Sequence, residues 1–191
     1  MNTRLYGSIC MIGSVLVCLG FLIAAPTVAD GVEASDYMGL QGFTLMAWMV
    51  GSALGVIAMI RHNVVGRGTV SRFLAFVVVV AFALLFIGQT YHYLTGVDPN
   101  TSESPLISLG WLLYMVGSLL LAILTIAAGT WRGWKRFMPL VAFLGILVTP
   151  VLGDLIGNIF YVSWIAYAPW TAIGYAVFTM GITLGLEGSV A

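Results

Sequence analysis

The chain has 191 residues, of which 61% are hydrophobic and 7% are charged, and its formal net charge is zero at pH 7. A soluble domain carries about 25% charged residues, and a water-soluble fold of this length cannot hide so much apolar surface. Lipid is the solvent that suits this composition, so we expect an integral membrane protein. The balanced charge gives no bulk basic field, which argues against nucleic acid as a partner.

Six apolar runs follow one another along the chain, each near or above the roughly 20 residues that a helix needs to cross the hydrocarbon. Helices are expected because lipid offers no partner to an open backbone N–H or C=O group. The predicted fold is therefore all-α, a bundle of six transmembrane helices in a single domain over residues 1–191. The predicted helices cover about residues 6–29, 38–60, 73–95, 106–130, 137–157 and 158–186.

The first apolar run could instead be a secretory signal, because Arg4 precedes it and Thr27-Val28-Ala29 follows it. A signal peptide has an apolar region of about 7–15 residues. The run in this chain is longer, so we interpret it as a true first span.

Charged residues divide the connections between the predicted helices into two kinds. All seven basic residues fall on one side of the membrane, namely Arg4, Arg61, Arg67, Arg72, Arg132, Lys135 and Arg136. Six of the seven acids fall on the other side, with Glu187 as the exception, namely Asp30, Glu33, Asp36, Asp98, Glu103 and Asp154. The positive-inside rule assigns the basic side to the cytoplasm. We therefore predict a multi-pass protein of the cell membrane with both termini in the cytoplasm.

A short sequence recurs in the second and fourth predicted helices. Met49-Val50-Gly51-Ser52 is repeated 66 residues later as Met115-Val116-Gly117-Ser118. A basic loop follows each copy, and then Arg72-Phe73 or Arg136-Phe137 opens the next helix. A duplicated helical hairpin would give a parallel repeat. Chance similarity in a chain rich in valine, leucine and glycine is the alternative.

Small and aromatic residues mark expected packing and interface positions. Glycines four residues apart let helix backbones approach closely. Such pairs occur at Gly51 and Gly55, Gly153 and Gly157, and Gly181 and Gly185. Trp131 and Trp134 beside the basic loop are typical of an interfacial aromatic belt, as are Tyr91 and Tyr93 at the opposite face.

Polar residues inside the predicted spans gather in one layer near the outer leaflet. At a rise of about 1.5 Å per residue, Gln89 lies about 24 Å and His92 about 28 Å from the cytoplasmic start of the third helix. Asp154 lies about 26 Å along the fifth helix by the same rise. The candidate ligand-binding residues of this layer and the adjoining turns are Gln41, Gln89, His92, Asp154, Asn158, Tyr161 and Trp164.

Two interpretations of this layer stay open. In the first, it is an outward-open polar vestibule, where Asp154 and His92 relay protons, bind a cation or hold a quinol headgroup. Pro150 and Pro169 predict helix kinks beside it. In the second, the same residues lie at the headgroup level, cap helix ends and contact water, and Asp154 is a turn residue between two spans.

The sequence favours no catalytic chemistry. It contains no P-loop, HExxH sequence or nucleophile elbow. Cys10 and Cys18 are about 12 Å apart along a helix, too far for a disulfide, and no Cys/His metal spacing occurs. His62 and His92 are predicted on opposite sides of the bilayer, which excludes a haem held by two histidines. Ligation by one histidine and one methionine stays open. We therefore predict no cofactor and no metal site.

Three functions are compatible with these features. The leading hypothesis is a non-enzymatic protein for transport or permeation of a small solute or ion, or the binding subunit of such a system, using the outer polar pocket. Six helices make a narrow bundle, so besides the lipid bilayer we expect a homo-oligomer or other membrane subunits as partners. The second hypothesis is a structural or anchor subunit of a larger membrane complex. The third is a membrane enzyme that interacts with a quinone or a lipid.

Overall fold

The computed structural model describes residues 3–29, 35–95, 104–141, 143–144 and 147. These residues form four long helices and one short 3-10 helix: α1 (Thr3–Ala29), α2 (Ser35–Arg61), α3 (Thr69–Thr95), α4 (Pro105–Ala128) and η1 (Gly133–Phe137). Residues 138–141, 143–144 and 147 are also helical. The all-α expectation is confirmed for this part of the chain. The rest of the fifth predicted helix and all of the sixth lie outside it.

The four long helices overlap the first four ranges expected from hydropathy, and their ends differ from those ranges by at most four residues. Three of them contain stretches long and apolar enough to cross a membrane, namely Gly42–Arg61, Thr69–Thr95 and Pro105–Ala128. In α1, the shorter stretch Leu5–Gly20 is apolar. The composition of these helices is thus that of a membrane-embedded protein.

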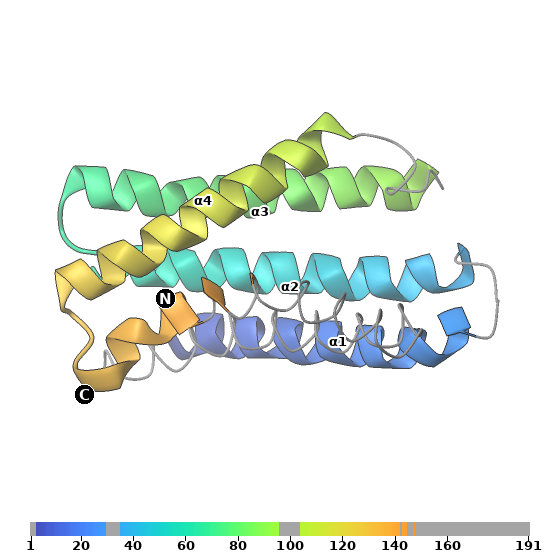
Figure 1. The fold of residues 1–191 in the computed structure, drawn as a ribbon, viewed down its shortest axis with the longest axis horizontal. Helices are drawn as coiled ribbons and strands as arrows, with labels where there is room; N and C mark the ends of the chain where they lie inside the picture. Colours follow the sequence, from blue (N-terminus) through green and yellow to red (C-terminus); the bar gives the residue numbers. More distant parts are fainter. Residues whose placement is uncertain (1–2, 30–34, 96–103, 142, 145–146, 148–191) are drawn as a thin grey trace.

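The described helices form two hairpins that pack side by side. Helix α1 packs along α2, α2 along α3, and α3 along α4, which lies obliquely to the other three (Figure 1). The connection between α2 and α3 is short and ordered by backbone hydrogen bonds, in which the N–H groups of His62 and Val64 donate to Ala58 and Met59. This succession makes the helices alternate in direction, as repeated crossing of a bilayer requires.

Glycines allow the two helices of the first hairpin, α1 and α2, to approach each other closely. A Cβ atom added at Gly13 of α1 would lie 2.7 Å from the carbonyl oxygen of Ala47. A Cβ atom added at Gly51 of α2 would lie 2.9 Å from the carbonyl oxygen of Ile9. Helices in lipid associate through close packing, for which a missing side chain is needed at the crossing point. The close approach expected at Gly51 is found, and the partner helix is α1 of the same chain.

In the second hairpin, glycines of α4 pack against side chains of α3. A Cβ atom at Gly117 of α4 would lie 2.8 Å from the Val78 Cγ2 atom, and one at Gly110 would lie 2.8 Å from the Leu85 Cγ atom. Both partners belong to the buried face of α3. The two copies of the Met-Val-Gly-Ser sequence therefore each place a glycine against the preceding helix of the same hairpin.

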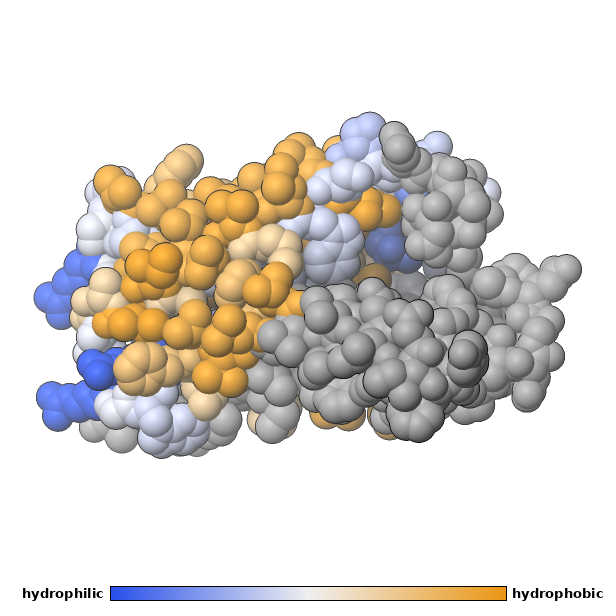
Figure 2. All heavy atoms as spheres, in the orientation of Figure 1, coloured by the Kyte–Doolittle hydropathy of each residue, from blue (hydrophilic) through white to orange (hydrophobic). Residues whose placement is uncertain are grey.

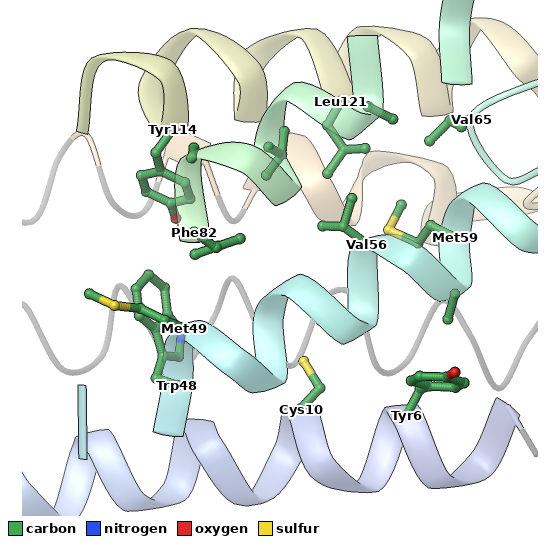
Figure 3. Packing of buried hydrophobic residues seen from close by; sticks show 14 of the residues in the cluster. Tyr6, Cys10, Trp48, Met49, Val56, Met59, Val65, Phe82, Tyr114 and Leu121 are labelled. Atoms are coloured by element: carbon green, nitrogen blue, oxygen red, sulfur yellow. The ribbon is translucent and has the colours of Figure 1, made fainter. Parts of the chain in front are cut away.

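Three aromatic rings from three helices meet in the centre of the described bundle. We call Trp48, Phe82 and Tyr114 the aromatic cluster (Figure 3). Trp48 and Phe82 pack edge to face with centroids 5.3 Å apart, and Phe82 and Tyr114 have centroids 5.1 Å apart. Each residue stands thirteen or fourteen positions from the same end of the bundle, so the three rings share one depth. The cluster also joins α2 to α4, because the rings of Trp48 and Tyr114 pack against each other.

Large apolar side chains also cover the outer faces of α3 and α4. They recur at steps of three and four residues, which places them on one side of each helix. On α3 they include Phe73, Phe76, Val80 and Ile87, and on α4 they include Leu109, Leu112, Val116, Leu119 and Ile123. Figure 2 shows this apolar surface across the middle of the bundle. Such a continuous apolar surface is stable against acyl chains and unstable against water.

Candidate functional site

The two ends of the described bundle differ in chemistry, and side-chain hydrogen bonds join neighbouring helices at the basic end. Arg61 at the end of α2 donates a hydrogen bond to the Tyr6 hydroxyl of α1 at 3.4 Å. Arg72 in α3 donates to the Asn63 side-chain oxygen at 2.6 Å, and the Thr130 hydroxyl donates to the Asn63 carbonyl oxygen at 3.0 Å. Asn63 thus connects the start of α3 with the end of α4, and Arg61 connects the end of α2 with the start of α1. Hydrophilic side chains collect at this end in Figure 2.

The expected polar layer lies at the other end, where α2 begins and α3 ends. Gln89 and His92 stand in the last two turns of α3. Gly42 of α2 faces Gln89 and Tyr93, because a Cβ atom added there would lie 3.4 Å from Gln89 Nε2 and 3.6 Å from Tyr93 Cδ2. The missing side chain at Gly42 thus leaves room for an amide and a phenol ring against the α2 backbone.

His92 belongs to the inward face of α3. Its side chain is 4% exposed, and it continues the buried row that includes Leu85 and Gly88. Its ring stands edge-on to Tyr91 with centroids 5.7 Å apart. Polar groups at membrane depth are costly unless they meet other polar groups or a cavity. A buried imidazole at this position is therefore the most informative polar side chain of the described layer.

Thr90 is part of this end, and the sequence reasoning missed it. Its hydroxyl donates to the Phe86 carbonyl oxygen at 2.7 Å and lies 3.2 Å from the sulfur of Met46 on α2. Together with Gly42 and Gln89, it ties the end of α3 to the start of α2. The unbroken polar run from Gln89 to His92 was the signal that could have found it.

Of the four aromatic residues expected at the membrane interfaces, three have exposed side chains and one is buried. Tyr91 and Tyr93 are 58% and 51% exposed, and Trp134 is 59% exposed, which suits a membrane interface. The same expectation for Trp131 is wrong, because its side chain is 1% exposed. Gly129 adopts a left-handed conformation with φ of 59° at the end of α4. The chain turns there and seats Trp131 in the core of the bundle end.

The structure describes three of the seven candidate site residues. Gln89 and His92 lie in the last two turns of α3, with Gln89 over Gly42. The backbone of Gln41 lies in the second turn of α2. The remaining four candidates, Asp154, Asn158, Tyr161 and Trp164, lie outside the described residues. Their meeting with His92 stays a prediction. No group of three or more metal-ligating side chains occurs among the described residues.

The described end offers a small set of polar groups to a ligand. Gln89 supplies an amide that both donates and accepts hydrogen bonds, and His92 supplies an imidazole whose ring nitrogens can also donate and accept. Tyr93 adds an aromatic ring beside the amide. These groups suit recognition of a small polar molecule or transfer of a proton. Comparison with protein-family models, curated proteins and solved structures found no match to this chain.

Proposed function

We propose that the chain is a six-helix integral membrane protein with both termini in the cytoplasm, and that it carries a small solute or ion across the membrane or binds it for such a system. Three described helices with the length and composition of spans support the membrane assignment. The gathering of basic residues at one end of the described bundle supports the orientation, because basic connections are retained in the cytoplasm.

One observation carries the transport proposal. His92 is buried at the end of the bundle away from the arginines, beside the half-buried Gln89 that lies over Gly42. An ionisable residue inside a membrane-spanning segment is a candidate for a functional site, because burying it in hydrocarbon is costly. This position of His92 and Gln89 best supports transport through a pocket near the outer leaflet, which Asp154 and Asn158 would complete.

Flux through reconstituted vesicles tests this proposal. Purified protein in vesicles is offered protons, potassium ions and glycerol as separate probes, with dyes or light scattering as the readouts. We expect at least one probe to cross faster than in empty vesicles, and the His92→Leu, Gln89→Leu and Asp154→Asn variants to slow that flux at least tenfold. Tyr91→Phe is the matched control, because Tyr91 is exposed on the same turn of α3.

Two results would contradict the proposal. If all three probes cross no faster than they cross empty vesicles, permeation through the isolated chain is excluded. If none of the three polar-layer variants changes the flux, the outer pocket takes no part in transport. Folding of each variant is checked by its elution from a sizing column and its thermal unfolding in detergent.

The anchor-subunit hypothesis is supported by the glycine pairs, which could dock onto other subunits. Gly51 packs against α1 of the same chain, and the pairs Gly153 and Gly157, and Gly181 and Gly185, lie outside the described residues. A discrete heteromeric complex on a native gel in mild detergent would nevertheless favour that hypothesis. A homo-oligomer would favour transport.

A further inference from the structure

The basic end of the bundle carries a surface that its internal contacts do not use. Arg61 and Arg72 donate hydrogen bonds to Tyr6 and Asn63 within the bundle. Four of the other basic residues of this end have a described exposure, and all four are exposed or half-buried. We call them the basic rim: Arg67, Arg132, Lys135 and Arg136. None of the four forms an ion pair with a described residue. Asp36, the one carboxylic acid in the described ranges, stands at the opposite end of α2.

The segment that carries three of the rim residues is held in a defined place. After α4, Gly129 and Gly133 adopt positive φ angles of 59° and 66°, so the chain turns twice in five residues. Between these turns, Trp131 is buried, and the Thr130 hydroxyl bonds to the α2–α3 connection. Helix η1 then follows with Lys135 and Arg136 in its last turn. The cations are thus presented by a fixed scaffold.

Exposed apolar side chains stand beside these charges. Trp134 is 59% exposed and Phe137 is 38% exposed, and both belong to η1. The Arg136 guanidinium lies 4.7 Å from the centre of the Phe137 ring. At the start of α3, next to Arg67 in the chain, Val70 and Phe73 are 72% and 66% exposed. Charge and apolar surface therefore alternate within a few residues on both segments.

This pairing identifies the chemistry of the occupant. A free anion needs the cations alone and gains nothing from an exposed tryptophan and phenylalanine. A phospholipid presents a phosphate directly above apolar chains, and tryptophan prefers that boundary. Clusters of four or more basic residues beside a membrane span attract anionic lipid. We propose that the basic rim binds the headgroups of anionic phospholipids, with Trp134 and Phe137 seated at the boundary between headgroups and acyl chains.

Lipid retention by the full-length protein tests the proposal. The protein is placed in nanodiscs with equal amounts of phosphatidylglycerol and phosphatidylcholine, extracted into mild detergent, and analysed by native mass spectrometry. We expect phosphatidylglycerol to be retained preferentially. The double variant Arg132→Gln with Arg136→Gln should lower this preference by roughly 25-fold, since each basic residue near an anionic surface contributes about fivefold. Retention of phosphatidylcholine stays unchanged.

Controls separate the rim from general charge and from free phosphate. Arg72→Gln removes one charge at the same end from a residue that is bonded to Asn63, so we expect it to change lipid preference less than Arg132→Gln does. Wild-type protein in 1 M salt should lose the preference without any substitution, because exposed charges are screened. Inorganic phosphate at millimolar concentration should leave the preference intact.

Three results would overturn the proposal. One is equal retention of the two lipids by the wild type. Another is a preference that survives both the double variant and 1 M salt. The third is full displacement of phosphatidylglycerol by inorganic phosphate, which would make the rim a site for free anions. If the double variant fails to fold, the salt series on the wild type still decides the outcome.

Discussion

Trp48 of α2 and Tyr114 of α4 stand 66 positions apart in the sequence, yet their rings pack edge to face with centroids 6.0 Å apart and planes at 87°. Each directly precedes one copy of the repeated Met-Val-Gly-Ser sequence. Helices α1 and α3 begin and end with the same separation of 66 residues. This agreement favours duplication over chance similarity.

The aromatic cluster should be a main source of stability. Replacing the buried Phe82 by alanine removes ring contacts to both Trp48 and Tyr114, and a buried Phe→Ala change costs about 3–5 kcal/mol. Phe76→Ala on the same helix is the matched control, because Phe76 is 50% exposed and Phe82 is 1% exposed. Thermal unfolding in detergent measures both. Equal losses for the two variants would show that the cluster is no more important than the lipid-facing surface.

The two repeated glycines should differ in their tolerance of alanine. A Cβ atom at Gly51 meets backbone atoms of Ile9 and Cys10 at 2.9 and 3.0 Å, and these cannot move without shifting α1. At Gly117, the nearest atom is the Cγ2 of Val78 at 2.8 Å, and backbone atoms begin at 3.5 Å. We expect Gly51→Ala to destabilise by about 1–3 kcal/mol and Gly117→Ala by less. The reverse order in thermal unfolding would contradict this packing.

Asn63 should stabilise the basic end through both its backbone and its side chain. Its φ angle is 57°, a conformation that asparagine and glycine adopt more easily than other residues. Its side chain also accepts the hydrogen bond from Arg72. Asn63→Ala loses both contributions, with an expected cost of about 1–2 kcal/mol, and Asn63→Gly loses only the second. Chemical unfolding should therefore rank the wild type first, glycine second and alanine third.

The orientation can be tested with cysteine labelling of whole cells. Arg67→Cys and Thr95→Cys place a thiol just before α3 and at its end, and both native residues are exposed. We expect a membrane-impermeant maleimide to label position 95 and to leave position 67 unlabelled until the cells are opened. The native thiols give little background, since Cys10 is buried and Cys18 is half-buried in α1. Labelling of position 67 in intact cells would reverse the proposed topology.

Part of this protein could be predicted from its sequence because lipid imposes strong local rules. A span must be helical, apolar and about 20 residues long, so hydropathy located the four described helices. The pattern of basic residues also predicted that the loops around Arg67 and Lys135 share one end, and the hydrogen bonds around Asn63 join those loops. The repeat is visible in the sequence as a four-residue match.

Pairwise contacts were decided only by the tertiary structure. Hydropathy assigns a depth to Trp48, Phe82 and Tyr114 but cannot tell which face of each helix is turned inward, because every face of these helices is apolar. For the same reason, the sequence placed Trp131 at the interface although its side chain is buried. It also could not predict that Gln89 packs over Gly42. In water, the hydrophobic effect marks the inner face of a helix in the sequence. In lipid both faces are apolar, so shape complementarity at positions such as Gly51 determines which surfaces meet.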